Sequence, residues 1–176
     1  MKPATKPLKK NFQNWHRKVQ VWIFSRNGAG HPMCLLLKTN PQRGDFWQPV
    51  TGSVEENEGF FEAACREPME ETKLPFAAPP LDTGLEFEFV SRFGPTRERI
   101  FTLYVEDMPE PVLDPKEHNA FEWLAPKDVL GRLKYRSNVD GLFHSYELIF
   151  GSKLDAPRPT MHSPRSETLR STGQKS

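Results

Sequence analysis

The sequence lacks three features that would each place it in a special class of proteins. It has only two cysteines, Cys34 and Cys65, without a CxxC spacing, so neither a disulfide framework nor a cysteine metal site is indicated. No run approaches 18 consecutive apolar residues, so no membrane-spanning helix is expected. Positive and negative side chains nearly cancel, at 24 and 23, and no global field points to nucleic acid or a membrane surface.

The 176 residues suit one domain of ordinary size. The lysine-rich N-terminus is not followed by an apolar segment, so no standard signal peptide is indicated and a cytoplasmic protein is expected. We expect a flexible lead-in over residues 1–14 and a folded domain over 15–151. Residues 152–176 contain few apolar side chains and are predicted to be a disordered tail.

Hydrophobic periodicity gives a simple order of elements. Alternating residues predict strands at 17–24 and 85–93, and short runs rich in apolar residues predict strands at 33–39, 97–107 and 120–126. Helical spacing predicts two main helices, at 59–72 and at 138–150, with Ser137 as the N-cap of the second. The order strand, strand, helix, three strands, helix predicts an α+β fold, in which helices cover both sides of a mixed sheet.

Seven glutamates fall between Gly52 and Leu74. Three of them, Glu67, Glu70 and Glu71, stand at i, i+3 and i+4, which places them within an arc of roughly 100° on a helix. Such carboxylates repel each other unless a cation lies between them, and Mg²⁺ prefers oxygen ligands. The spacing alone also permits a solvated acidic surface.

A fixed pattern surrounds these glutamates. Gly52 is followed after five residues by Glu58, and after seven more by the segment 66–74, REPMEETKL. The pattern resembles the Nudix box, G-x5-E-x7-R-E-U-x-E-E-x-G-U, in which U is apolar. Two positions depart from it, since Pro68 stands at the first apolar position and Lys73 at the second glycine.

The resemblance implies the Nudix fold, an α/β/α sandwich with a mixed sheet between helices, and hydrolysis that depends on Mg²⁺, for which Mn²⁺ can substitute. It implies that Arg66 belongs to the catalytic residues and that Glu58 is structural, holding Arg66 and the loop before the helix. One of the helix glutamates, or a glutamate on a distant loop, would be the general base. The implied metal ligands are Glu67, Glu70, Glu71 and the carbonyl of Gly52.

A second segment narrows the resemblance. Residues 46–58, FWQPVTGSVEENE, are similar to the text that opens the box in the dihydroneopterin triphosphate pyrophosphatase branch, which is close to MutT-like nucleoside triphosphate pyrophosphohydrolases. The later pairs 117–118 (EH) and 123–124 (WL) are similar too. The likeness implies Glu117 as a further metal ligand or base, with a plain acidic loop residue as the alternative.

Three residues are candidate substrate contacts. Trp47 could stack on a heterocycle, although a buried tryptophan beside the box is an equal alternative. Arg97 could bind a phosphate through two parallel hydrogen bonds, and its alternative is pairing with glutamates across the strands. Lys38 is the third candidate.

The two departures from the box affect the helix differently. Pro68 removes the hydrogen bond to the carbonyl of residue 64 and disfavours the α conformation at Glu67, so we expect a kinked but working helix. Lys73 must adopt the left-handed conformation that glycine normally supplies, at a cost of roughly 1 kcal/mol.

The resemblance implies a Mg²⁺-dependent pyrophosphohydrolase that cleaves a nucleoside triphosphate or dihydroneopterin triphosphate by water attack at phosphorus. One alternative is a hydrolase of nucleoside diphosphate derivatives, such as a nucleotide sugar or a dinucleoside polyphosphate. A second alternative is a catalytically weak nucleotide-binding Nudix domain, which Pro68 alone supports. The expected partner is a small nucleotide or pteridine phosphate, without nucleic acid or membrane, and the expected state is a monomer or homodimer.

Overall fold

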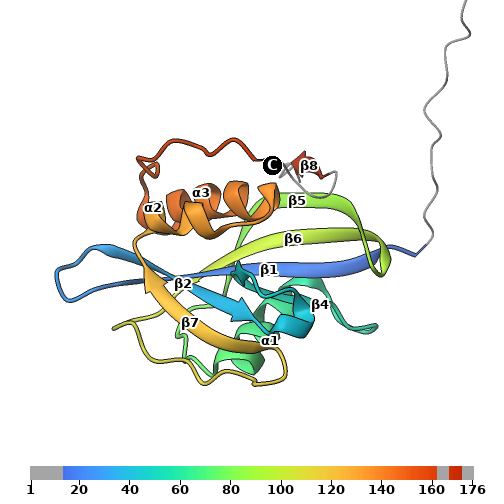
Figure 1. Cartoon of the computed structure of the whole chain (residues 1–176), viewed down its shortest axis with the longest axis horizontal. Coiled ribbons are helices and arrows are strands. Elements are labelled where there is room, and N and C mark those ends of the chain that lie inside the picture. The colour runs from blue at the N-terminus through green and yellow to red at the C-terminus, as the bar shows by residue number, and fades with distance from the viewer. Residues whose placement is uncertain (1–13, 162–166, 172–176) are drawn as a thin grey trace, which may run out of the picture.

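A mixed sheet separates two helices in the computed structural model (Figure 1), which describes residues 14–161 and 167–171. The strands are β1 (His16–Arg26), β2 (Pro32–Thr39), β3 (Trp47–Gln48), β4 (Val50–Ser53), β5 (Leu81–Ser91), β6 (Gly94–Tyr104), β7 (His118–Leu124) and β8 (Thr168–Ser171). The helices are α1 (Phe60–Thr72), α2 (Pro126–Val129) and α3 (Arg136–Phe150), with short 3₁₀ turns at Pro41–Arg43 and Leu130–Arg132.

Strand β1 organises the sheet. It pairs in parallel with β6 along most of its length, and antiparallel with β4 near its start and with β2 near its end. The order along the main path is β3-β2-β1-β6-β5-β8, and β7 pairs with β2. The first half of β1 therefore carries β4, which leads through a loop into α1.

Each face of the sheet buries its own apolar cluster. Trp22 and Phe24 of β1 pack with Val139 and Leu142 under α3. The alternate β1 residues, such as Val21, pack on the other face with Ala63 and Ala64 of α1. This arrangement confirms the predicted sandwich, with helices on opposite sides of a mixed sheet (Figure 1).

The predicted strands and main helices are present, but two local predictions were wrong. No strand was predicted within 46–58, but this segment contains β3 and β4, which are too short to show a period and are separated by Pro49. Ser137 is not the N-cap, because α3 begins at Arg136 after Tyr135. The Ser137 amide instead donates to the Glu167 carboxylate at 2.6 Å, a partner from far along the chain.

The described part of the predicted tail is ordered against the domain. Leu154, Ala156 and Met161 pack on the cluster beneath α3, and β8 pairs with β5 at the sheet edge. The prediction of disorder thus differs from the structure over 152–161 and 167–171, since a few apolar side chains and backbone pairing suffice to attach the segment. Residues 162–166 and 172–176, and 1–13 of the predicted lead-in, lie outside the described residues.

Helix α1 continues through Pro68 to Thr72. Lys73 then adopts the expected left-handed conformation, with φ of 56°, and its amide donates to the carbonyl of Met69 at 3.1 Å. Met69 is 43% exposed, while Glu67 and Glu71 are buried. The helix therefore turns two carboxylates toward the protein. Among the described residues, no helix is long and apolar enough to cross a membrane.

Candidate active site

Arg66 holds the loop before α1 against the helix. Its guanidinium donates to both oxygens of Glu58, at 2.7 and 2.8 Å, and to the carbonyl of Ser53 at 2.9 Å. It also donates to Glu67 at 2.9 Å and to Glu70 at 3.0 Å. The expected contact between Glu58 and Arg66 is therefore present, and one cation arranges three carboxylates of the box.

The box glycine lies directly beneath Glu67. A Cβ placed on Gly52 would lie only 1.9 Å from the carboxyl carbon of Glu67, so any larger residue would displace that carboxylate. Glycine at this position lets α1 approach β4 closely enough to bury Glu67, which is 8% exposed. Steric crowding against Glu67 thus explains why glycine stands at the first position of the box.

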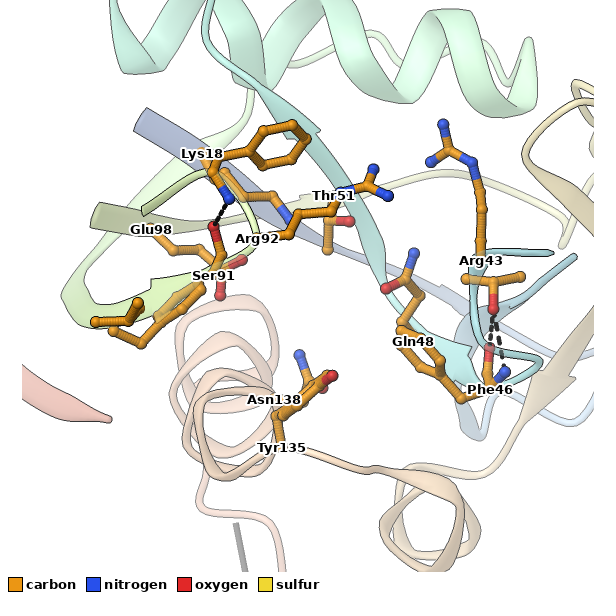
Figure 2. A pocket seen from close by; sticks show the side chains of 14 residues that line it. Lys18, Arg43, Phe46, Gln48, Thr51, Ser91, Arg92, Glu98, Tyr135 and Asn138 are labelled. Carbon is orange, nitrogen blue, oxygen red and sulfur yellow. Dashed lines mark hydrogen bonds between the residues drawn. The ribbon is translucent and has the colours of Figure 1, made fainter. Parts of the chain in front are cut away.

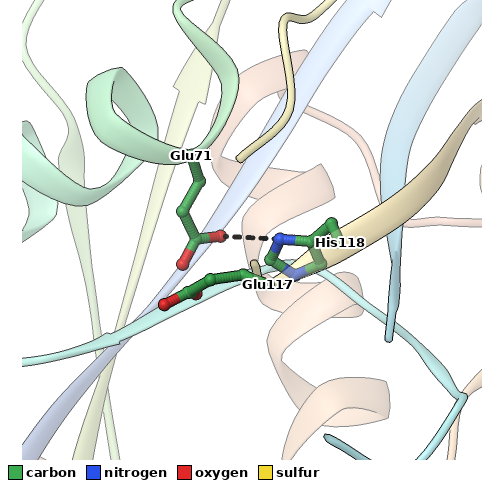
Figure 3. Close-up of side chains that lie close together, drawn as sticks. All are labelled: Glu71, Glu117 and His118. Atoms are coloured by element: carbon green, nitrogen blue, oxygen red, sulfur yellow. Dashed lines mark ion pairs between the residues drawn. The ribbon is translucent and has the colours of Figure 1, made fainter. Parts of the chain in front are cut away.

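Glu71 meets two residues that come from β7 and the loop before it. One ligand atom from each of Glu71, Glu117 and His118 can be chosen so that all lie within 4.8 Å of one another (Figure 3). Glu71 is 3% exposed, and within the described residues neither of its carboxylate oxygens has a hydrogen-bond partner. The Nδ1 atom of His118 lies 3.9 Å from Glu71, too far for a hydrogen bond.

The electrostatics of these groups follow from burial. Burial raises the pKa of Glu67 to about 7, although Arg66 opposes the shift. Burial, followed by the charges of Glu67 and Glu117, raises the pKa of Glu71 well above its usual value. Burial lowers the pKa of His118 to about 4, so its imidazole is neutral near pH 7.

A divalent cation fits this set of groups. A buried carboxylate without a donor is costly, and a bound cation removes that cost by pairing with it. The donors available are carboxylate oxygens and a neutral imidazole nitrogen, all competent ligands for divalent ions. Glu71, Glu117 and His118 can therefore hold a divalent ion in this fold.

Figure 2 shows a cavity of the protein, whose volume is about 410 Å³. Two of its lining residues connect it to the acidic cluster. Arg43 forms an ion pair with Glu117 at 3.1 Å, and the Gln48 amide lies 3.5 Å from His118 Nε2. The other lining residues include Lys18, Thr51, Phe89, Arg92, Glu98, Tyr135 and Asn138. The cavity is large enough for a drug-sized heterocyclic ligand.

Comparison with known proteins decides the family. The model of the NUDIX domain matches residues 15–145, most of the chain. The chain belongs to the Nudix family. It is a Nudix hydrolase, and this family cleaves phosphoanhydride bonds and generally uses a divalent metal ion.

Two curated proteins are similar to this Nudix hydrolase. A dihydroneopterin triphosphate diphosphatase from Haemophilus influenzae is 32% identical over 140 residues, which cover 72% of this chain and 85% of that protein. An octanoyltransferase from Myxococcus xanthus is 36% identical over 122 residues. That alignment covers 68% of this chain, which spans only about a third (34%) of the octanoyltransferase.

Solved structures share the fold. An Ap4A hydrolase from C. elegans, in a binary complex, has a TM-score of 0.66 at 21% identity, with 78% of this chain and 99% of that chain covered. The E. coli dihydroneopterin triphosphate pyrophosphohydrolase has a TM-score of 0.60 at 23% identity, with 78% and 99% covered. At these identities the likeness shows the Nudix fold alone.

The structure groups the predicted metal and catalytic residues unevenly. Glu67 and Glu71 are buried, and Glu117 joins Glu71 from the other side of the site. Glu70 differs, because its side chain is 57% exposed and pairs with Arg66. Its carboxylate lies at the solvent edge of the Arg66 network.

The three candidate substrate contacts lie outside the lining of the cavity. Lys38 pairs with Asp45 at 3.1 Å, and Arg97 pairs with Glu86 and Glu88, the cross-strand alternative. Trp47 precedes Gln48, and successive side chains of a strand point to opposite faces. Gln48 lines the cavity, whereas Trp47 packs against the cluster beneath α3.

Sequence reasoning missed several polar residues around the cavity. Lys18 and Glu98 stand opposite each other on β1 and β6, and Asn138 comes from the first turn of α3. Arg43 comes from the turn after β2. None of these belongs to a motif, and Glu98 stands between Arg97 and Arg99 in the sequence, so no local pattern marked it.

Proposed function

We propose that this Nudix hydrolase uses Mg²⁺ to cleave the diphosphate linkage of a nucleoside triphosphate or of dihydroneopterin triphosphate by attack of water at phosphorus. The observation that carries the proposal is Glu71, a buried carboxylate without a hydrogen-bond partner among the described residues, beside Glu117 and a neutral His118. The similarity to the Haemophilus influenzae dihydroneopterin triphosphate diphosphatase supports the choice of substrate.

The metal ligands of the proposal combine the box and the structure. Glu67 and Glu71 supply buried carboxylates from α1, and Glu117 and His118 supply donors from the facing segment. The box resemblance adds Glu70 and the Gly52 carbonyl. When bound, Mg²⁺ neutralises phosphate charge and lowers the pKa of a coordinated water; Mn²⁺ is expected to substitute.

Glu117 is the proposed general base. It clusters with Glu71 and His118, and its side chain is 30% exposed, so it can be reached by water. Its ion pair with Arg43, at 3.1 Å, places the carboxylate beside a residue that lines the cavity, where it can accept a proton from the attacking water. Arg66 acts as a positioning residue, since it contacts Glu67 and Glu70.

Cationic side chains in the cavity wall are suited to the phosphate chain. Lys18, Arg43 and Arg92 all line the cavity, and Arg43 lies next to the proposed base. A triphosphate whose reacting end lies at Glu117 would bring its phosphates next to Arg43 and leave the rest of the cavity to its ring. The charge distribution thus supports a substrate with several phosphates at one end and a heterocycle at the other.

A substrate panel with product analysis tests the proposal. The panel contains nucleoside triphosphates, dihydroneopterin triphosphate, nucleotide sugars and dinucleoside polyphosphates, each with Mg²⁺ or Mn²⁺. We expect inorganic pyrophosphate and a monophosphate from a triphosphate substrate. Preferred cleavage of a nucleotide sugar or dinucleoside polyphosphate would overturn the substrate assignment. Nucleotide binding without turnover across the metals would favour the catalytically weak alternative.

A further inference from the structure

A chain of hydrogen bonds reaches the cavity from beneath α3. The indole Nε1 of Trp22 donates to Gln20 Oε1 at 2.7 Å, and Gln20 Nε2 donates to Glu98 Oε1 at 3.0 Å. An indole nitrogen can only donate, so it fixes which end of the Gln20 amide faces Glu98. Glu98 is therefore held as a hydrogen-bond acceptor by two neighbours that are themselves fully buried.

Helix α3 is fitted closely over this chain. A Cβ on Gly141 would lie 2.4 Å from Gln20 Oε1 and 2.7 Å from Trp22 Nε1. The glycine lets the helix cover both polar groups and keep water away from them. The position of Glu98 is thus fixed by packing as well as by hydrogen bonds.

Two buried acceptors face the cavity from different elements. Glu98, on β6, is 2% exposed, and Asn138, in the first turn of α3, is 3% exposed. Both line the cavity (Figure 2). Within residues 14–161 and 167–171, Asn138 Oδ1 has no hydrogen-bond partner. The Glu98 carboxylate accepts a hydrogen bond from Gln20. Buried acceptors with spare capacity require a donor, which a ligand can supply.

The chemistry of these acceptors selects among heterocycles. A carboxylate matches two adjacent N–H groups, as it matches the fork of an arginine. A 2-amino-4-oxopyrimidine edge offers such a pair, in its ring N–H and its exocyclic amine. Adenine and cytosine present a ring acceptor next to their amine, and uracil flanks its single N–H with two carbonyl groups. Each of those would leave Glu98 facing an acceptor.

We propose that Glu98 and Asn138 select a ring with a 2-amino-4-oxopyrimidine edge, the edge that pterin and guanine share. Glu98 accepts the ring N–H and one amine hydrogen, and Asn138 Oδ1 accepts a further donor of the ring. Phe89 and Tyr135 line the same cavity and offer aromatic surface against the ring. This inference rests on the proposed function for its orientation, with the phosphates toward Glu117.

The decisive variant is Glu98→Gln. Gln20 would still donate to the amide oxygen, so the new amine would face the cavity and oppose the N–H groups of the ring. We expect kcat/KM for dihydroneopterin triphosphate and GTP to fall at least about 10-fold, while the value for ATP is unchanged or rises. Asn138→Ala should lower the same two values. Glu147→Gln, an exposed change on α3, is the matched control.

The loss of kcat/KM in Glu98→Gln is compared between dihydroneopterin triphosphate and GTP. The larger loss identifies which ring the cavity prefers. Equal losses for ATP and for both 2-amino-4-oxo substrates would overturn the proposal, because they would mean a structural role only. Thermal melts of each variant establish that the fold is retained.

Binding of the rings without phosphates separates this inference from the proposed function. Neopterin, guanosine and adenosine are titrated into the metal-free wild type and into Glu98→Gln. Preference for neopterin or guanosine that the variant loses supports the ring assignment, even if no triphosphate is hydrolysed. Turnover of triphosphates without any ring preference in either assay leaves the proposed function standing and overturns the inference.

Discussion

Two glutamates of the same box have opposite surroundings. Glu58 accepts two hydrogen bonds from Arg66 and one from the amide of Glu55, and the bonds from Arg66 lower the pKa of its carboxyl. Glu71 is buried without a donor among the described residues, and burial raises its pKa. Arg66 supplies the positive charge that balances Glu58, whereas we expect a bound cation to supply the charge that balances Glu71.

The difference separates structural from functional charge within a single motif. A carboxylate neutralised by an internal arginine can be strongly bound and contribute to the shape of the loop. A carboxylate buried without a partner costs stability in the metal-free protein and binds a cation in return. The four predictions below change one side of this comparison at a time.

The largest effect is expected from Glu71→Gln. The amide keeps the size of the side chain but cannot supply the charge that holds the cation, so kcat should fall by about 10³-fold or more. The free energy of unfolding without metal should be unchanged or higher, because a costly buried charge is removed. Steady-state kinetics and denaturation with EDTA measure both. Glu56→Gln, at an exposed position, is the control; full activity in Glu71→Gln would contradict the metal assignment.

Gly52→Ala should displace the Glu67 carboxylate, because the added methyl group would overlap it. We expect a loss of about 10²-fold in kcat together with a destabilisation of about 1–3 kcal/mol. The matched change is Gly28→Ala, since a Cβ there meets no atom within 4 Å. Equal effects of the two substitutions on activity would exclude the steric explanation.

Glu58→Gln weakens the partner that the protein supplies for Arg66. The amide oxygen could still accept one hydrogen bond from Arg66, but the negative charge of Glu58 would be lost. We therefore expect about a 10-fold loss in kcat/KM and a modest fall in the free energy of unfolding. A Mg²⁺ titration distinguishes this role from a ligand role: the Mg²⁺ concentration for half-maximal activity should change much less than in Glu67→Gln. A larger shift in Glu58→Gln would place Glu58 among the ligands.

The smallest effect concerns pH. The pKa of Glu67 is raised from its usual 4.5 to about 7, so its contribution to stability in metal-free protein is lost as pH rises through this range. His118 acts in the opposite direction, because its pKa is lowered from 6.5 to about 4 and its contribution is lost as pH falls from 6.5 toward 4. Comparing wild type with Glu67→Gln isolates the glutamate.

In EDTA, raising the pH from 4.5 to 7.5 should lower the melting temperature of the wild type by roughly 5 °C relative to Glu67→Gln. Saturating Mg²⁺ should remove this difference by binding the ionised carboxylate of the wild type. Parallel pH profiles for the two proteins in EDTA would show that Glu67 is not strained by burial.

Much of the fold followed from periodicity and spacing. The strands at both ends of the Asn27-Gly28 turn, the helix after Gly52 and the apolar stripe of α3 were all predicted, since each depends on neighbours within one element. Strands β3 and β4 were missed because two to four residues are too few to show a period. Strand β8 was missed because it is stabilised by pairing with β5, a partner distant in sequence.

The candidate site divides in the same way. The sequence by itself determined the box, its arginine and its helix carboxylates, because their chemistry depends on spacing along one loop and helix. Only the tertiary structure decided that Glu71 is buried without a hydrogen-bond donor among the described residues, that Glu117 and His118 meet it, and that Glu98 and Asn138 share a cavity. Burial and the meeting of distant strands are consequences of packing, and no local pattern encodes them.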